Sequence, residues 1–250
     1  MDLGLKGRIA LVTGGTSGLG RAIAGALVDE GCDVHAADIN LPSTRGGSEL
    51  DARDVRSLCM DVGDASGVQQ AVDGIIAERG RIDILVNCAG ILKTRSIVES
   101  TIADWDEVAR VNLSGVYYCS KAVLPAMIAQ RYGKIINIAS ISSVKGGGVF
   151  GNVLYGTTKA GVVAMTQGLA RELGPYGINV NAISPGVIEG TAMTAGFMTP
   201  EVHQRLVDSI PLRRLTEPAE IARLALYLAS DVSRSITGQA IVIDSGFLVR

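Results

Sequence analysis

Tyr155 and Lys159 are the residues whose types and spacing most directly suggest chemistry, in the run Tyr155-Gly156-Thr157-Thr158-Lys159. In a helix, residues four positions apart lie on the same face, so a phenol and an ammonium would share one space. The ordinary pKa of tyrosine is about 10, and a neighbouring cation favours the phenolate. We therefore expect Lys159 to lower the pKa of Tyr155 and make it an acid and base. A helix surface with one aromatic residue and one solvated charge is the alternative.

The elements that must position this pair follow from an alternation of short β-branched runs and longer helical patterns, which is typical of a parallel sheet covered by helices on both faces. The expected strands are residues 8–13, 33–38, 57–60, 82–87, 134–139, 179–183 and 240–243. The expected helices are residues 20–30, 105–130 with a break near Pro125, and 154–173. We predict an α/β fold, a Rossmann-type doubly wound parallel sheet of about seven strands, in a single domain over residues 1–250 with a loop at 43–53.

A glycine-rich turn follows the first expected strand and opens the first expected helix, in the run Thr13-Gly14-Gly15-Thr16-Ser17-Gly18-Leu19-Gly20. In this context glycines let a pyrophosphate approach backbone N–H groups at the positive end of a helix. The turn therefore predicts a dinucleotide site that includes Gly14, Thr16, Ser17, Gly18, Leu19 and Gly20.

Asp38 ends the second expected strand, where a carboxylate can accept hydrogen bonds from both hydroxyls of the adenosine ribose. It would repel a 2′-phosphate, so the sequence favours NAD over NADP as cofactor. Asp61 and Val62 follow the third strand and could offer a carboxylate and an amide to the adenine, although a simple turn is equally compatible. Asn87 ends the fourth strand and Ala89 and Gly90 follow it, at the sheet edge where ligands bind in such folds.

The composition of the chain argues against some classes of partner. The net charge is −2, without basic runs, and no apolar run is long enough to cross a membrane, so we expect neither nucleic acid nor membrane as partner and place the protein in the cytoplasm. The four cysteines are widely spaced and are interpreted as reduced core thiols: Cys32, Cys59, Cys88 and Cys119. Two isolated histidines, interpreted as structural, predict no metal site.

Taken in order, the glycine turn, Asp38, Asn87-x-Ala-Gly, Asn112 and Tyr155-x-x-x-Lys159 closely resemble the motifs of the short-chain dehydrogenase/reductase family. The resemblance runs from residue 6 to residue 246. It departs from the usual pattern at Cys88, where the family has a second asparagine, and in a longer segment between the strand-end serine and Tyr155.

The resemblance implies a catalytic tetrad: Asn112, Ser140, Tyr155 and Lys159. It implies that Tyr155 exchanges a proton with the substrate oxygen, that Lys159 tunes Tyr155 and binds the nicotinamide ribose, and that Asn112 holds a water beside Lys159. Ser140 would polarise the substrate oxygen, and Ser142 is the alternative because its spacing to Tyr155 is the more usual one.

The same resemblance implies that a turn after the sixth strand faces the nicotinamide carboxamide, with Pro185, Gly186, Ile188 and Thr191. Substrate specificity is expected in residues 91–98, 141–154 and 187–212, where Lys93, Arg95 and Lys145 would attract a hydroxylated or anionic substrate unless they are ordinary solvated charges.

The expected function is an NAD-dependent oxidoreductase that interconverts a secondary alcohol and a ketone of the sugar, polyol or hydroxy-acid type. A 3-oxoacyl thioester reductase is the alternative, and a non-catalytic NAD-binding regulator is the alternative from another class. The family also implies a homotetramer assembled through the helices near residues 105–130 and 154–173.

Overall fold

The computed structural model describes residues 2–41, 55–150 and 152–249, so the loop expected at 43–53 lies outside the described residues. Its centre is a parallel sheet of seven strands in the order β3-β2-β1-β4-β5-β6-β7. The strands are β1 (Ile9–Thr13), β2 (Asp33–Asp38), β3 (Arg56–Cys59), β4 (Ile84–Asn87), β5 (Gly133–Ile138), β6 (Ile178–Pro185) and β7 (Ala240–Ile243). The order changes direction after β1, and this reversal is where doubly wound sheets bind ligands.

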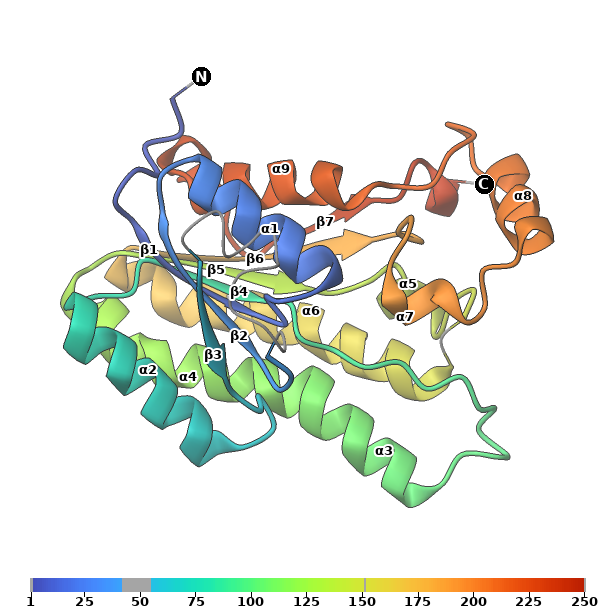
Figure 1. Ribbon diagram of the computed structural model, residues 1–250, viewed down its shortest axis with the longest axis horizontal. Helices are drawn as coiled ribbons and strands as arrows, with labels where there is room; N and C mark the ends of the chain where they lie inside the picture. Colours follow the sequence, from blue (N-terminus) through green and yellow to red (C-terminus); the bar gives the residue numbers. More distant parts are fainter. Residues whose placement is uncertain (1, 42–54, 151, 250) are drawn as a thin grey trace.

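Helices cover both faces of the sheet (Figure 1). They are α1 (Gly18–Asp29), α2 (Ala65–Arg79), α3 (Ile102–Ala109), α4 (Gly115–Ala129), α5 (Ser142–Lys145), α6 (Val153–Leu173), α7 (Ala192–Ala195), α8 (Pro200–Ser209) and α9 (Pro218–Ala229). Helices α1 and α9 lie over one face, and α2, α4 and α6 lie over the other. The predicted fold class is therefore confirmed.

The buried core explains why the sequences of the strands are continuous apolar runs. All five residues of β1 and all four of β4 are buried, because each face of the sheet carries its own layer of helices. A separate small core lies beyond the carboxyl ends of the strands, where Leu206 of α8 packs with Ile141 and Phe247. This third cluster fixes α8 over the sheet edge that holds the site.

The predicted break near Pro125 is wrong. Pro125 lies inside α4, and the missing hydrogen bond concerns the carbonyl of Lys121, an exposed residue where water can bind instead. The interruption occurs earlier, at a π-helical turn over Arg110–Ser114 that joins α3 to α4 and contains Asn112. Such turns often mark functional positions.

Hydrogen bonds and ion pairs of Asp83 hold the amino ends of the strands together. Its fully buried carboxylate accepts the backbone N–H of Ile9 at 2.9 Å and the side chains of Arg81 at 3.0 Å and Arg8 at 3.4 Å. We expect Asp83→Ala to lower the free energy of unfolding by about 2–3 kcal/mol, because it leaves the buried N–H of Ile9 and the side chain of Arg81 without their acceptor, while Arg8 keeps its pairing with Asp231. Urea unfolding measures this loss, and the exposed Asp106→Ala on α3 is the matched control. Equal stability of the two variants would contradict the prediction.

Candidate active site

A cavity of about 750 Å³ opens at the carboxyl edge of the sheet. Most of the residues predicted for the site line it: Gly14, Ser17, Gly18, Leu19, Gly20, Asp38, Asp61, Val62, Ala89, Gly90, Ser140, Tyr155, Lys159, Pro185, Gly186, Ile188 and Thr191. The alternative serine, Ser142, lines it as well. Three of the predicted residues do not: Thr16, Asn87 and Asn112.

The glycine turn has the geometry of a phosphate cradle. A Cβ on Gly20 would lie 2.1 Å from the carbonyl oxygen of Gly14, so only glycine lets the turn pack this tightly. Gly18 has a φ of +50° and open space where a side chain would be. Ser17 begins α1 without a hydrogen bond from its side chain to the helix, so the first N–H groups of α1 stay available for an anion.

Asp38 stands at the end of β2 and faces the cavity. Its carboxylate accepts the hydroxyl of Thr16 at 2.7 Å and the backbone N–H of Asn40 at 3.3 Å. Thr16 therefore orients Asp38 and does not itself line the cavity. The carboxylate keeps lone pairs for further donors, which fits a ribose diol.

Asp61 is already engaged by a residue that the sequence analysis missed. Arg110 of the π-helical turn donates to its carboxylate at 2.8 Å, as does the N–H of Gly63 at 2.8 Å. Burial raises the pKa of Asp61, but these hydrogen bonds outweigh it and lower the pKa overall. Asp61 thus presents a neutralised pair to the cavity. The sequence signal that could have identified Arg110 is its position two residues before Asn112.

Tyr155 and Lys159 come from the first turns of α6, whose N-cap residue Asn152 accepts the N–H of Tyr155 at 3.2 Å. The ammonium of Lys159 is buried and donates to the carbonyl of Ile138 at 2.7 Å. It lies 5.7 Å from the centre of the Tyr155 ring. Ser140, two residues after the end of β5, lowers the pKa of Tyr155 through its side chain.

The pKa of Tyr155 departs from the expectation. Burial raises it to about 12, the hydrogen bond with Ser140 lowers it in part, and Lys159 makes no appreciable contribution. Burial also lowers the pKa of Lys159 to about 8. The expected lowering by Lys159 is therefore wrong for this structure, because the low-dielectric site disfavours the ammonium as well as the phenolate.

Ser140 and Ser142 both line the cavity, and the backbone N–H of Ser142 donates to Ser140 Oγ at 3.1 Å. Of the two serines, Ser140 is the one that lowers the pKa of Tyr155. The extra residues between serine and tyrosine form α5 and the glycine turn after it, where Gly146 has a φ of +67°. The geometry thus favours Ser140 over Ser142 as the catalytic serine.

Asn112 and Asn87 are buried behind the cavity wall. Asn112 Oδ1 accepts the N–H of Ile91 at 2.8 Å, and its amide donates to the Ile91 carbonyl at 2.9 Å, so it fastens the loop after β4 to the π-helical turn. The water expected beside Lys159 stays a prediction. Asn87 donates to Asn137 at 2.8 Å and to Ser120 at 3.2 Å, and its predicted contact with the cofactor stays a prediction.

The turn after β6 closes the far wall. Pro185 accepts the N–H of Ile141 through its carbonyl at 3.0 Å, and a Cβ on Gly186 would lie 2.9 Å from Cα of Asp244. Thr191 is the N-cap residue of α7, and its hydroxyl lies 3.0 Å from that of Thr194. Sequence reasoning missed three cavity residues that carry no motif, Ile39, Met60 and Glu107. Other lining residues lie in the segments expected to set specificity: Ile91, Leu92, Val149, Phe150 and Met193.

The cysteines are free thiols, but two of them are not core residues: Cys59 is exposed, since edge strand β3 is only partly covered, and Cys88 lines the cavity. Burial raises the pKa of Cys88 to about 12, so little thiolate exists at neutral pH.

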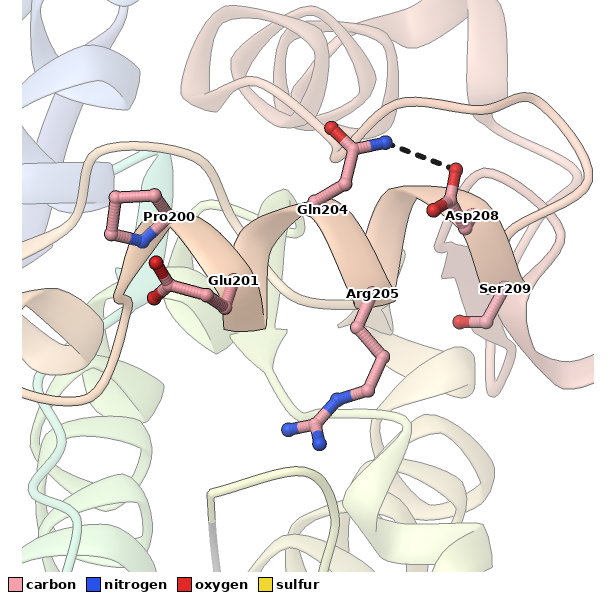
Figure 2. A pocket seen from close by; sticks show the side chains of 6 residues that line it. All are labelled: Pro200, Glu201, Gln204, Arg205, Asp208 and Ser209. Carbon is pink, nitrogen blue, oxygen red and sulfur yellow. Dashed lines mark hydrogen bonds between the residues drawn. The ribbon is translucent and has the colours of Figure 1, made fainter.

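A second hollow lies on α8 and is lined by Pro200, Glu201, Gln204, Arg205, Asp208 and Ser209. Figure 2 shows Gln204 donating to Asp208 on one side of the helix while Arg205 extends to the other. These side chains come from one helix and do not converge on a common point, so this surface is not the candidate site.

Within residues 2–41, 55–150 and 152–249, no cluster of three or more histidine, cysteine, aspartate or glutamate side chains could hold a metal ion. None of the helices in that part of the chain has the length and apolar character needed to cross a membrane.

The buried lysine generates a prediction. Folding lowers the pKa of Lys159 from 10.5 to about 8, so burial of its charge destabilises the fold below about pH 8. This penalty fades as the pH rises from about 8 to 10.5. We expect Lys159→Met to be more stable than the parent by about 1–2 kcal/mol at pH 7, after allowance for the lost bond to Ile138.

Urea unfolding at pH 7 and pH 10 measures this difference, which should narrow at the higher pH. Lys121→Met, at an exposed position of α4, is the control and should show no such change. A Lys159→Met protein less stable than the parent at pH 7 would contradict the interpretation.

The chain resembles known proteins over nearly its whole length. A family model described as enoyl-(acyl carrier protein) reductase matches residues 14–248. The chain is 39% identical over 248 residues to the 3-oxoacyl-[acyl-carrier-protein] reductase FabG of Thermotoga maritima, covering 98% of this chain and 99% of that protein. It is 38% identical over 254 residues to the D-threitol dehydrogenase of Mycolicibacterium smegmatis, covering 100% and 96%.

Among solved structures, the ligand-free aldohexose dehydrogenase AldT of Thermoplasma acidophilum matches with a TM-score of 0.89 and 29% identity, covering 100% of this chain and 97% of that one. These matches extend over nearly the whole chain and include its glycine turn and its tyrosine and lysine. The chain therefore belongs to the short-chain dehydrogenase/reductase family, whose members are oxidoreductases that bind a nicotinamide cofactor.

Proposed function

We propose that this protein is an NAD-dependent oxidoreductase that interconverts a secondary alcohol and a ketone, with a substrate of the sugar, polyol or hydroxy-acid type. The observation that carries the proposal is one continuous cavity that joins Asp38 and the glycine turn to Ser140, Tyr155 and Lys159. A dinucleotide laid along this cavity would bring its nicotinamide to the tyrosine.

The residues of the site fit a dinucleotide. The open space beside Gly18 and the available N–H groups of α1 suit the pyrophosphate, and Asp38 suits the adenosine ribose. Lys159 would donate to the nicotinamide ribose, and the turn containing Ile188 and Thr191 would hold the carboxamide. When bound, the nicotinamide supplies or accepts the hydride.

The protein's own residues would manage the proton. In reduction, the Tyr155 hydroxyl gives its proton to the substrate oxygen, while the Ser140 hydroxyl donates a hydrogen bond to that oxygen and stabilises its developing charge. In oxidation the proton moves the other way, which requires the tyrosine to lose its own proton.

Relatives named as 3-oxoacyl-[acyl-carrier-protein] reductases favour a second candidate, reduction of a 3-oxoacyl thioester. D-threitol dehydrogenase and aldohexose dehydrogenase favour the first. The orientation of Asp38 supports the first candidate, because its carboxylate opposes a 2′-phosphate. A non-catalytic regulator is not retained, since the family consists of oxidoreductases.

We further propose that residues 1–250 act as one domain, and that the protein works in the cytoplasm as a homotetramer. The outer sides of α4 and α6 support an assembly surface, with Tyr117 and Val153 both exposed there.

Tyr155→Phe tests the proton transfer. It removes only the hydroxyl, so we expect the turnover number to fall by about 10²- to 10⁴-fold while the protein still binds NADH. Absorbance of NADH at 340 nm follows turnover, and quenching or enhancement of NADH fluorescence follows binding. Tyr176→Phe, at an exposed position, is the control. A Tyr155→Phe enzyme as active as the parent would refute the mechanism.

Asp38→Ala tests the choice of cofactor. Loss of two hydrogen bonds to a carboxylate should lower kcat/KM for NAD by about 10- to 100-fold and raise it for NADP. Thr16→Val removes the 2.7 Å bond that orients Asp38 but keeps the carboxylate, so it should have a smaller effect in the same direction. Equal turnover of NAD and NADP by the parent enzyme would overturn the assignment.

A further inference from the structure

The substrate end of the cavity is the part next to Ser140 and Tyr155, formed by Leu92, Ser142, Val149, Phe150, Val187 and Met193. Five of these six side chains are apolar. The ring of Phe150 stacks on that of Phe197 with their centres 5.9 Å apart, which fixes the wall contributed by the loop after α5. The surface offered to a substrate here is apolar with added hydroxyl groups.

The charged residues of the cavity lie elsewhere. In the part of the chain that the structure describes, those that line it are Asp38, Asp61, Glu107, Arg110 and Lys159. Asp38 ends β2 and Asp61 follows β3, whereas Ser140 and Val187 follow β5 and β6, on the other side of β1 and β4 in the sheet. Arg110 is paired with Asp61. Lys159 is thus the cation nearest the substrate end, and its ammonium binds the Ile138 carbonyl.

The three loop cations expected to attract an anion are each held by another group. Lys93 pairs with Glu107 at 2.7 Å, and Arg95 pairs with Asp104 at 3.3 Å. Lys145 lies 4.3 Å from the ring centre of Phe247. None of the three is among the residues that line the cavity. A carboxylate beside the reacting carbon would therefore lose its water without gaining a cation, which is costly.

We propose that the enzyme takes substrates that are uncharged around the reacting carbon, such as neutral ketones, sugars, polyols or oxo esters, and rejects hydroxy acids and oxo acids. This inference rests on the proposed function and narrows its substrate class. In the reductive direction, hydride from the reduced nicotinamide adds to the carbonyl carbon and a proton from Tyr155 adds to the oxygen, which yields the alcohol and the oxidised nicotinamide.

A matched pair of probes isolates the charge. Ethyl acetoacetate and acetoacetate share the same ketone and differ in whether the neighbouring group is a neutral ester or a carboxylate. With NADH, we expect kcat/KM for the ester to exceed that for the acid by about 100-fold or more, equivalent to about 2.8 kcal/mol. Equal rates, or a faster acid, would overturn the proposal.

Met193→Arg supplies the missing cation. It should raise kcat/KM for the acid relative to the ester by about tenfold or more, because the carboxylate gains a partner. Val232→Arg, at a position of similar exposure near the amino ends of the strands, is the control and should leave the ratio unchanged. An unchanged ratio in Met193→Arg would count against the proposed position of the substrate end.

A binding measurement separates this inference from the proposed function. If neither probe is reduced, the shift in Tm of the NADH-loaded protein on addition of each probe is compared. Stabilisation by the ester alone supports an uncharged substrate even though the proposed reaction has failed. Stabilisation by the acid, or by neither probe, refutes the inference.

Discussion

The hydrogen bond from the Lys159 ammonium to the carbonyl of Ile138, 2.7 Å long and buried, is the contact on which the site depends. It joins the helix that carries Tyr155 to the end of β5, the strand that precedes Ser140. A buried cation is unfavourable unless it is hydrogen-bonded, so this hydrogen bond is what allows a lysine to be buried here. The same burial explains why the pKa of the lysine falls while that of the tyrosine rises. The site is held away from water at a cost in stability.

A buried ladder of polar side chains supports that contact from behind. Asn87 donates to Asn137 at 2.8 Å, and Asn137 donates to Thr166 of α6 at 2.9 Å. Because amides have directional bonding, this ladder fixes how α6 sits against β4 and β5. Asn137 directly precedes Ile138, so the ladder also sets the position of the carbonyl that Lys159 binds. Asn87 belongs to this support.

The cavity is divided chemically along the sheet edge. Toward β2 and β3 it carries carboxylates and the pair of Asp61 with Arg110, which suits a polar nucleoside. Toward β5 and β6 it carries apolar walls with a few hydroxyls. This division follows from strand order, because each strand end delivers its own residues to one place along the edge. Cofactor recognition and substrate recognition are thus separated by two strands.

Much of this could be predicted from the sequence. The strands and α6 lie within a few residues of their expected bounds, because buried strands require continuous apolar runs and helices require a 3.6-residue period. Glycine spacing and the tyrosine and lysine four residues apart are local patterns, and so is a carboxylate at a strand end. Sequence alone therefore determined the fold class and most residues of the cavity.

Tertiary structure decided what depends on partners distant in sequence. The pairing of Asp61 with Arg110, 49 residues away, and the burial of Asn87 beside Asn137 leave no local pattern. The same holds for Lys93, Arg95 and Lys145, whose charges are visible in the sequence but whose partners are not. The π-helical turn was also missed. Pro125 is a local signal that led to the wrong position for the break, whereas the turn at Asn112 is bonded to Ile91, which is distant in sequence. Burial decided the pKa of Tyr155, because the dielectric environment is a property of the packed fold. The four-residue spacing between Tyr155 and Lys159 does not reveal it.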